Sequence, residues 1–289
     1  MQSFTMNDGH QIPALGYGVF QMTSAEVTEH LPQALELGYR HIDTANAYFN
    51  EVAVGEVVRD AIAAGAVTRE DLFITTKLFP QSYPYAQCGK DIDATLERLG
   101  LDYVDLLLFH QPYGEYVAGW KAMEEAVAAG KVRSIGLSNF PIAKFQEILD
   151  VAEIIPAVNQ VEAHPRWNQH ELKAEMEQAA GTEVLVEAWY PLGHGDKTLL
   201  DEPAITAAAR RTGATPAQVI LAWHLAEKNV TFPKTLSRAH MADNLAVLDV
   251  ELTPDEIAAI NQIPQQPYYV IPDEPPAFTT TVMDYSQQA

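Results

Sequence analysis

Eight short hydrophobic runs recur along the 289-residue chain. They lie at residues 14–20, 41–45, 72–78, 103–109, 132–137, 157–163, 183–190 and 229–233. Each run is nearly continuous instead of alternating with polar residues, which is typical of strands covered on both faces, as in a parallel sheet.

Segments with helical periodicity separate these runs. They lie at residues 24–37, 51–64, 86–99, 117–129, 141–150, 169–180, 202–211, 216–227, 238–247 and 254–262. Thr23 with Glu26, and Thr253 with Glu256, have the spacing of a capping box at a helix start. Pro32 lies inside the first segment and is expected to shorten or kink that helix.

Strands that alternate with helices predict an α/β fold, and eight such units predict a closed (β/α)₈ TIM barrel. Two helices fall between the seventh and eighth runs, so one is an extra helix. The turn at residues 7–9 (Asn-Asp-Gly) predicts an N-terminal β-hairpin that could plug one end. The proline-rich, aromatic tail from Pro264 predicts a packed extended segment. We find no internal linker or repeat and expect a single domain over residues 1–289.

The chain is acidic, with 39 Asp and Glu against 18 Lys and Arg and a net charge of -21. Nucleic acid and anionic membranes are therefore unfavourable partners, because both require a basic surface. No signal-peptide pattern and no run of about 20 apolar residues is present. Cys88 is the only cysteine, which favours a reducing compartment. These features predict a soluble, cytoplasmic protein.

Ligands of such barrels bind at the carboxyl ends of the strands. Lys77 closes an apolar run there and must be paired or neutral, with Asp43 on the adjacent run as the natural partner. A lysine cation near Tyr48 is expected to lower the pKa of the phenol from about 10 and make it a usable proton donor. His110 is expected to donate a hydrogen bond to a substrate oxygen.

Each of these four residues also has a plain structural role open to it, such as capping a turn or filling the core. Their occurrence together at neighbouring strand ends favours a site. They supply an acid and an electrostatic support, but neither a nucleophile nor a redox group.

The same residues lie in stretches that resemble the aldo-keto reductase family. Residues 38–45 (GYRHIDTA), with Tyr48, Asn50-Glu51 and Gly55, resemble its first signature. The similarity continues through residues 75–78, 110–112, 130–140, 159–165, 189–193 and 233–235, and through Asp243-Asn244. The prokaryotic 2,5-diketo-D-gluconate-reductase-like branch is the most similar.

The resemblance implies reduction of a small-molecule aldehyde or ketone to an alcohol, with sugar-like or dicarbonyl compounds as candidates. It implies Tyr48 as the acid, Lys77 and Asp43 as its tuning pair, and His110 as the residue that positions the carbonyl. NADPH would supply the missing redox group. No metal is implied, and we expect a monomer.

The resemblance also implies a set of cofactor-binding residues. Ser138, Asn139 and Gln160 would hold the carboxamide of the nicotinamide. Trp189 would stack on the nicotinamide ring. The other implied cofactor-binding residues are Leu192, Lys234, Thr235, Arg238, His240 and Asn244. Lys234, Arg238 and His240 form a local basic island for the phosphates. His240 replaces an arginine common in relatives, so NADPH is expected to be used with NADH more competitive than in those relatives.

The expected substrate-pocket walls are Phe20, Phe79, Gln111, Trp120 and the tail from Pro264. Gln111 stands where several relatives carry tryptophan, which favours polar, sugar-like carbonyls. A pocket that selects simple aldehydes is the alternative.

Two other functions remain open. A metal-dependent hydrolase on the same barrel would use His41, Asp43, His110 and His164, although the chain lacks a His-x-His pair. The second alternative is a non-catalytic NADPH-binding module of the same fold. The presence of all four candidate residues, Asp43, Tyr48, Lys77 and His110, argues against it. A Rossmann dehydrogenase is weaker, because residues 16–21 lack the third glycine of a dinucleotide-binding fingerprint.

Overall fold

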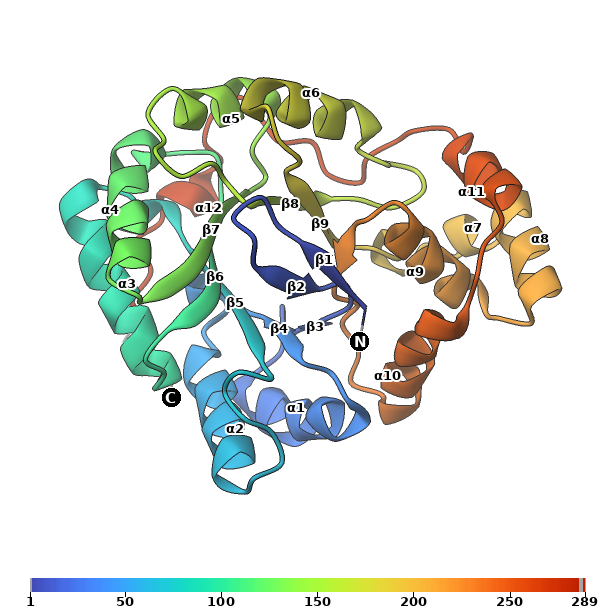
Figure 1. Ribbon diagram of the computed structural model, residues 1–289, viewed down its shortest axis with the longest axis horizontal. Coiled ribbons are helices and arrows are strands. Elements are labelled where there is room, and N and C mark those ends of the chain that lie inside the picture. Colours follow the sequence, from blue (N-terminus) through green and yellow to red (C-terminus); the bar gives the residue numbers. More distant parts are fainter. Residues whose placement is uncertain (1, 286–287, 289) are drawn as a thin grey trace.

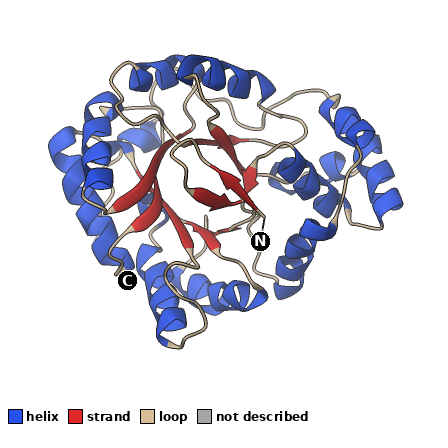
Figure 2. Cartoon of the chain, viewed as in Figure 1, coloured by secondary structure: helices blue, strands red, loops and turns tan. Residues whose placement is uncertain are grey.

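The computed structural model describes residues 2–285 and 288, and its centre is a sheet of eight parallel strands ringed by helices (Figures 1 and 2). The strands are β3 (Tyr17–Gly18), β4 (His41–Asp43), β5 (Phe73–Leu78), β6 (Val104–Phe109), β7 (Val132–Ser138), β8 (Val158–Glu162), β9 (Leu185–Trp189) and β10 (Val230–Thr231). Each predicted run covers one of these strands, except that β7 extends one residue beyond its run, to Ser138. Neighbours in the chain are neighbours in the sheet.

The sheet closes between its last strand and the residues before its first. Leu15 forms a parallel bridge with Thr231. The Gly16 amide donates to the Thr231 carbonyl at 2.8 Å, and the Thr231 amide donates to the Ala14 carbonyl at 3.0 Å. No strand edge is left open at this seam, so the predicted (β/α)₈ barrel is confirmed.

The helices occur where the periodicity predicts them, with ends close to those expected. They are α1 (Ser24–Leu37), α2 (Glu51–Ala63), α3 (Tyr85–Leu99), α4 (Tyr116–Ala128), α5 (Ile142–Leu149), α6 (His170–Ala180), α8 (Pro203–Thr212), α9 (Pro216–Ala226), α10 (Arg238–Leu245) and α11 (Pro254–Asn261). Two four-residue helices were not predicted: α7 (Lys197–Leu200) and α12 (Ala277–Thr280), the second inside the tail. The predicted extra helix before β10 is confirmed.

Helix α1 illustrates both a correct and an incorrect expectation. Thr23 and Glu26 form the predicted capping box, with the Thr23 hydroxyl accepting from the Glu26 amide. The helix then runs unbroken through Pro32, so the predicted shortening is wrong. Leu31 and Leu35 on either side of the proline are buried, and this packing offsets the missing backbone hydrogen bond.

The N-terminal hairpin, β1 (Ser3–Thr5) and β2 (Gln11–Pro13), crosses the centre of the barrel in Figure 1. Met6 and Ile12 are buried there against inward-facing residues of the barrel such as Leu106 and Val158. The predicted plug at one end is therefore confirmed. An apolar plug closes the amino ends of the strands, so ligands have access from the carboxyl ends.

The C-terminal tail packs over those carboxyl ends. The Glu162 carboxylate accepts hydrogen bonds from the backbone amides of Tyr268 (2.6 Å) and Tyr269 (2.9 Å). Further along, Gln81 exchanges two hydrogen bonds with the backbone of Met283. The tail is packed as predicted, but α12 interrupts its extended course.

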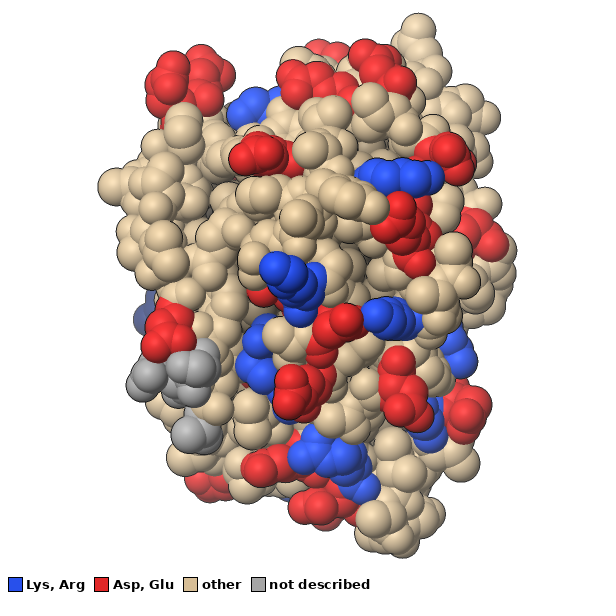
Figure 3. Space-filling view, turned by 90° about the vertical axis from the view of Figure 1, so that its left-hand side faces the viewer, with Lys and Arg blue, Asp and Glu red and all other residues tan. Residues whose placement is uncertain are grey.

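Acidic and basic side chains are interspersed on the face shown in Figure 3. Ion pairs such as that of Asp93 in α3 with Lys131, just before β7, lie on the outside of the molecule. The excess of negative charge is therefore not spread uniformly over that face. No helix in residues 2–285 is long and apolar enough to cross a membrane.

Two helical glycines provide a matched test of packing. An alanine Cβ at Gly55 in α2 would overlap the backbone carbonyl of Leu99 at the end of α3, whereas a Cβ at Gly89 in α3 meets nothing within 4 Å. We expect Gly55→Ala to destabilise the protein by about 1–3 kcal/mol. Gly89→Ala should stabilise it by about 0.5–1 kcal/mol, the ordinary helix propensity. Urea unfolding would measure both, and equal effects would contradict this view of the α2–α3 contact.

Candidate active site

Lys77 and Asp43 lie at the carboxyl ends of the adjacent strands β5 and β4, inside the barrel. The Lys77 ammonium donates to both carboxylate oxygens of Asp43, at 2.7 and 2.8 Å, and to the Thr44 carbonyl at 2.8 Å. The lysine is fully buried. Burial alone lowers the pKa of Lys77, but the charges and hydrogen bonds of Asp43 and Tyr48 together outweigh burial and raise it, so the side chain stays cationic. The predicted pair is confirmed.

Tyr48 stands beside this pair on a short 3₁₀ helix, Asn46–Tyr48, that follows β4. Its hydroxyl lies 3.2 Å from the Lys77 ammonium. Asn50 holds the segment, accepting from the Thr44 hydroxyl at 2.8 Å and donating to the carbonyls of Val19 and Met22. These contacts join the tyrosine loop to the loop after β3 and set the position of the phenol.

The pKa of Tyr48 differs from the expectation. Burial raises it to about 12, because removing the phenolate from water costs more than the nearby Lys77 cation returns, and Asp43 adds to the increase. The predicted lowering is wrong for the free site. Tyr48 therefore keeps its proton at neutral pH.

His110 follows β6, and its backbone amide donates to the Leu78 carbonyl at 2.9 Å. Its ring centroid lies 5.6 Å from that of Tyr48 and 5.7 Å from that of Phe79. Burial and the Lys77 cation hold the pKa of His110 well below its usual range. A neutral imidazole has one N–H available to donate to a ligand.

A second group of polar side chains lies at the ends of β7, β8 and β9. The Trp189 indole donates to the Asn139 side-chain oxygen at 2.9 Å, and the Asn139 amide donates to the Ser138 hydroxyl at 3.2 Å. The Gln160 amide donates to Asp43 at 2.9 Å. This last bond joins the two groups into one polar cluster.

The other predicted cofactor residues lie around β10 and α10, apart from Leu192, which follows β9 and is partly buried. Lys234, Arg238 and His240 are exposed, and Thr235 accepts from the Tyr17 hydroxyl through its carbonyl. Asn244 is 7% exposed and contacts Tyr39. Arg238 pairs with Glu36 of α1 at 2.9 Å. The basic island is therefore partly neutralised by a neighbouring helix.

Three of the four predicted pocket residues surround the tyrosine and histidine. The Phe20 ring lies 5.0 Å from that of Tyr48, Phe79 lies beside His110, and Gln111 follows His110 directly. The tail contributes Phe278, whose ring lies 6.4 Å from that of Phe79.

Trp120 does not belong to this group, and its prediction as a pocket wall is wrong. It is fully buried in α4, where its indole donates to the Ile154 carbonyl and its ring packs against the edge of Phe109. Phe109 points outward from β6 into the helical layer, so Trp120 packs between helix and sheet. Aromatic side chains on the inner face of a barrel helix fill this layer.

Two contributors were not predicted individually. Glu187, on β9, is fully buried and accepts from the Gln160 amide at 3.1 Å. Its signal in the sequence is the one that identified Lys77, a charged residue within an apolar run. Tyr269 of the tail lies with its ring 6.3 Å from that of Trp189.

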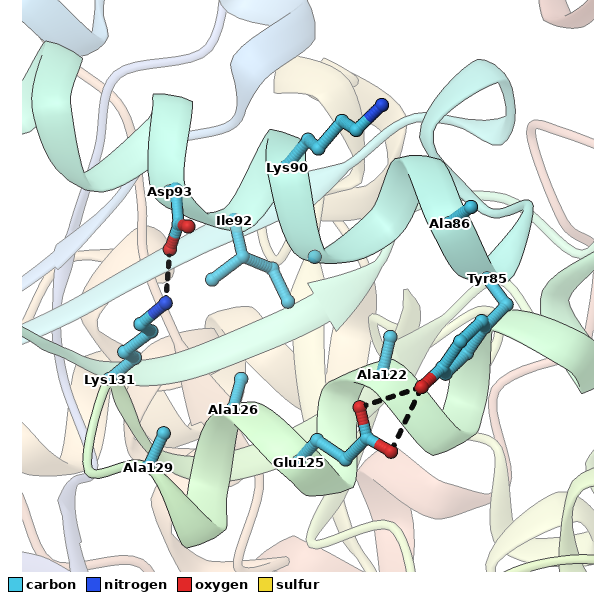
Figure 4. A pocket seen from close by; sticks show the side chains of 11 residues that line it. Tyr85, Ala86, Lys90, Ile92, Asp93, Ala122, Glu125, Ala126, Ala129 and Lys131 are labelled. Atoms are coloured by element: carbon cyan, nitrogen blue, oxygen red, sulfur yellow. Dashed lines mark hydrogen bonds and ion pairs between the residues drawn. The ribbon is translucent and has the colours of Figure 1, made fainter.

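A groove of about 460 Å³ lies elsewhere, on the outside between α3 and α4 (Figure 4). Ile92 and several alanines line it, with the Tyr85–Glu125 and Lys131–Asp93 contacts at its sides. None of the polar cluster faces it. The predicted site residues therefore lie at the strand ends and not in this groove.

The residues of the hydrolase alternative do not form a metal site. Within the part of the chain that the structure describes, no group of three or more His, Cys, Asp or Glu side chains is arranged to hold a metal ion. Asp43 is engaged by Lys77, and His41 bonds to Thr75 and the Pro13 carbonyl.

Comparison with known proteins gives a consistent result. Residues 14–265 match the model of the aldo/keto reductase family. An aldo-keto reductase of Mycobacterium sp. (strain MCS) is 43% identical over 90% of this chain and 89% of its own. The aldose reductase from Schistosoma japonicum superposes with a TM-score of 0.86 at 33% identity, covering 93% and 94% of the two chains. An aldo-keto reductase complexed with NADPH gives 0.84 at 35% identity, covering 91% and 88%.

Removing the carboxylate of Asp43 should test the cost of the buried pair. In Asp43→Asn the Lys77 cation loses its counter-charge without access to water, so we expect a loss of about 3–5 kcal/mol in the free energy of unfolding. Asp93→Asn breaks the half-exposed pair with Lys131 and should change stability far less. Guanidinium unfolding at pH 7 measures both, and a similar loss in the two variants would argue against a buried charge at Lys77.

Proposed function

Because this chain belongs to the aldo/keto reductase family, we propose that it reduces aldehydes or ketones to alcohols with NADPH as the hydride donor. The observation that carries the proposal is the contact between the Tyr48 hydroxyl and the Lys77 ammonium at 3.2 Å, with Asp43 bonded to the same lysine. These are the parts of a proton donor with an electrostatic support, at the end of the barrel where ligands bind.

The polar residues at the ends of β7 to β9 suit the nicotinamide carboxamide. Ser138, Asn139 and Gln160 offer hydroxyl and amide groups close together, and Trp189 presents a partly exposed aromatic ring beside them. When bound, NADPH supplies the hydride, while the protein contributes orientation and electrostatics. Lys234, Thr235 and the first turn of α10 would hold the phosphate of the adenosine.

Tyr48 gives its proton to the carbonyl oxygen as negative charge develops there. The phenolate that remains is stabilised by the Lys77 ammonium, and Asp43 holds that ammonium in place and charged. The raised pKa of Tyr48 keeps the proton on the phenol until a substrate accepts it. The transfer requires that the substrate oxygen become more basic than the buried phenolate.

His110 orients the carbonyl. Its depressed pKa means that it donates a hydrogen bond as a neutral imidazole and does not compete with Tyr48 as an acid. Lys77 supplies the positive charge near both groups. The division of roles follows from the opposite pKa shifts of lysine and histidine in one buried site.

The substrate is proposed to be a polar, sugar-like or dicarbonyl compound, as in the 2,5-diketo-D-gluconate-reductase-like branch. Gln111 next to His110 supports a polar substrate. The site is also flanked by three aromatic rings, which favour an apolar portion in the same substrate: Phe20, Phe79 and Phe278. A panel of sugar-like and simple aldehydes would distinguish the two. A monomeric state, a cytoplasmic location and a single domain remain predictions.

Tyr48→Phe tests the acid. We expect kcat for carbonyl reduction to fall by about 10²–10⁴, because general acid catalysis is removed, while NADPH still quenches tryptophan emission. Loss of NADPH absorbance at 340 nm gives the rate. Tyr85→Phe, on the exposed side of α3, should leave the rate unchanged. Equal rates in wild type and Tyr48→Phe would disprove the assignment.

His240→Arg tests cofactor preference. Restoring a guanidinium near the adenosine phosphate should add a charge-assisted hydrogen bond worth about 1.5–3 kcal/mol, so the NADPH/NADH ratio of kcat/KM should rise roughly tenfold or more. Wild type should discriminate less than relatives with arginine there. An unchanged ratio in the variant would show that Lys234 and Arg238 already saturate the site.

A further inference from the structure

Glu187 is a buried carboxyl group in the barrel interior that the proposed mechanism does not use. It lies on β9 in register with Gln160 of β8 and Val230 of β10, so its side chain points inward with that of Gln160. Its exposure is 0%. A carboxyl group in such a position is costly unless it is hydrogen-bonded and either paired or neutral.

One amide group connects Glu187 to the catalytic cluster. Gln160 Nε2 donates to Asp43 Oδ2 at 2.9 Å and to Glu187 Oε2 at 3.1 Å. An amide nitrogen carries two hydrogens, so the two carboxyl groups use both. The Gln160 amide is thereby fixed in one of its two flipped orientations, with its oxygen directed away from both acids.

The other oxygen of Glu187 is buried without a hydrogen-bond partner. The His41 Nε2 atom lies 3.9 Å from it, too far for a hydrogen bond. Burial lowers the pKa of His41 to about 4, so this histidine is neutral and supplies no counter-charge. An ionised carboxylate would leave this oxygen desolvated and unpaired.

The ionisable groups facing Glu187 come from β4 and β5: His41, Asp43 and Lys77. Lys77 is the one cation, and both Asp43 oxygens already engage it. A second carboxylate would bring a net negative charge into the barrel. Burial, reinforced by Asp43, accordingly raises the pKa of Glu187 to about 8.

We propose that Glu187 is a positioning residue: it is protonated at neutral pH and holds the Gln160 amide so that the amide oxygen faces the nicotinamide carboxamide. The carboxamide part of this inference rests on the proposed function. Because Glu187 is neutral, Asp43 remains the single counter-charge of Lys77. Glu187 holds Gln160 through its hydrogen bond and does not touch the reacting atoms.

The protonation state of Glu187 can be tested in the protein without cofactor. An unfolded glutamic acid ionises near pH 4.5, whereas the folded one ionises near pH 8. Between these two pH values only the unfolded state ionises Glu187. The free energy of unfolding therefore falls as pH rises from about 4.5 towards 8. Relative to Glu187→Gln, the folding equilibrium constant of wild type should fall tenfold per pH unit between pH 5.5 and 7.5, then level off above pH 8.5.

Urea unfolding of the two proteins from pH 5.5 to 9.5 gives this difference without any cofactor. Glutamine resembles the neutral acid in shape and can still accept from Gln160. A difference between the two proteins that is independent of pH across the range would show an ionised Glu187 and overturn the proposal.

The positioning role is tested by NADPH binding at pH 7, followed by quenching of tryptophan emission. Glu187→Gln should keep the wild-type Kd within about threefold, while Glu187→Leu, which removes the acceptor at similar volume, should weaken binding at least tenfold. Asp105→Asn removes another buried carboxylate, near the start of β6, and should leave the Kd unchanged even where stability falls. If Glu187→Leu does not fold, Glu187→Val, which also lacks an acceptor, replaces it.

An unchanged Kd in the variant lacking the acceptor would overturn the positioning role. A tenfold loss in Asp105→Asn as well would do the same, since the effect would then follow stability alone. If wild type itself does not bind NADPH, the proposed function fails, whereas the pH dependence of unfolding still decides whether Glu187 is protonated.

Discussion

The buried ammonium of Lys77 is the constraint on which the rest of the site depends. A cation in the interior of a closed barrel cannot reach water, so its charge and its three N–H groups have to be satisfied by the protein. Asp43 from the adjacent strand provides the charge, and the Thr44 carbonyl provides a further acceptor. The polar phenol of Tyr48 then completes the surroundings of the ammonium at 3.2 Å. The proposed acid is thus part of the lysine's own environment.

The same constraint spreads across the barrel through Gln160. By donating to Asp43 and to Glu187, its amide joins the lysine pair on β4 and β5 to β9 across the barrel interior. One cation can neutralise one carboxylate, so a second acid in the same interior is stable only in its neutral form. The amino ends of the strands are filled differently, because Met6 and Ile12 pack there in an apolar cluster with inward-facing residues of the barrel. The barrel is thereby divided into an apolar end and a polar end.

Much of this arrangement could be predicted from the sequence. The eight apolar runs predicted the strands, and parallel strands bring their carboxyl ends to one side of a sheet, which placed Lys77 near Asp43. The failures have specific physical causes. Trp120 was expected in the pocket, but it packs on Phe109 in the layer between α4 and the sheet. The shortening at Pro32 did not occur because the core holds both halves of α1. Glu187 was overlooked although it has the same signal as Lys77.

What the sequence determined by itself was the order of the elements, the closed barrel and the identity of the residues at its polar end, because these follow from local periodicity and from the topology of parallel strands. What only the tertiary structure decided was the balance of charge within that end. The pKa of Tyr48 is raised and not lowered, Arg238 is paired with Glu36 of α1, which is far away along the chain, and Glu187 shares the Gln160 amide with Asp43. Desolvation and charge pairing depend on distances between segments far apart in the chain, and a linear pattern of residues does not contain those distances.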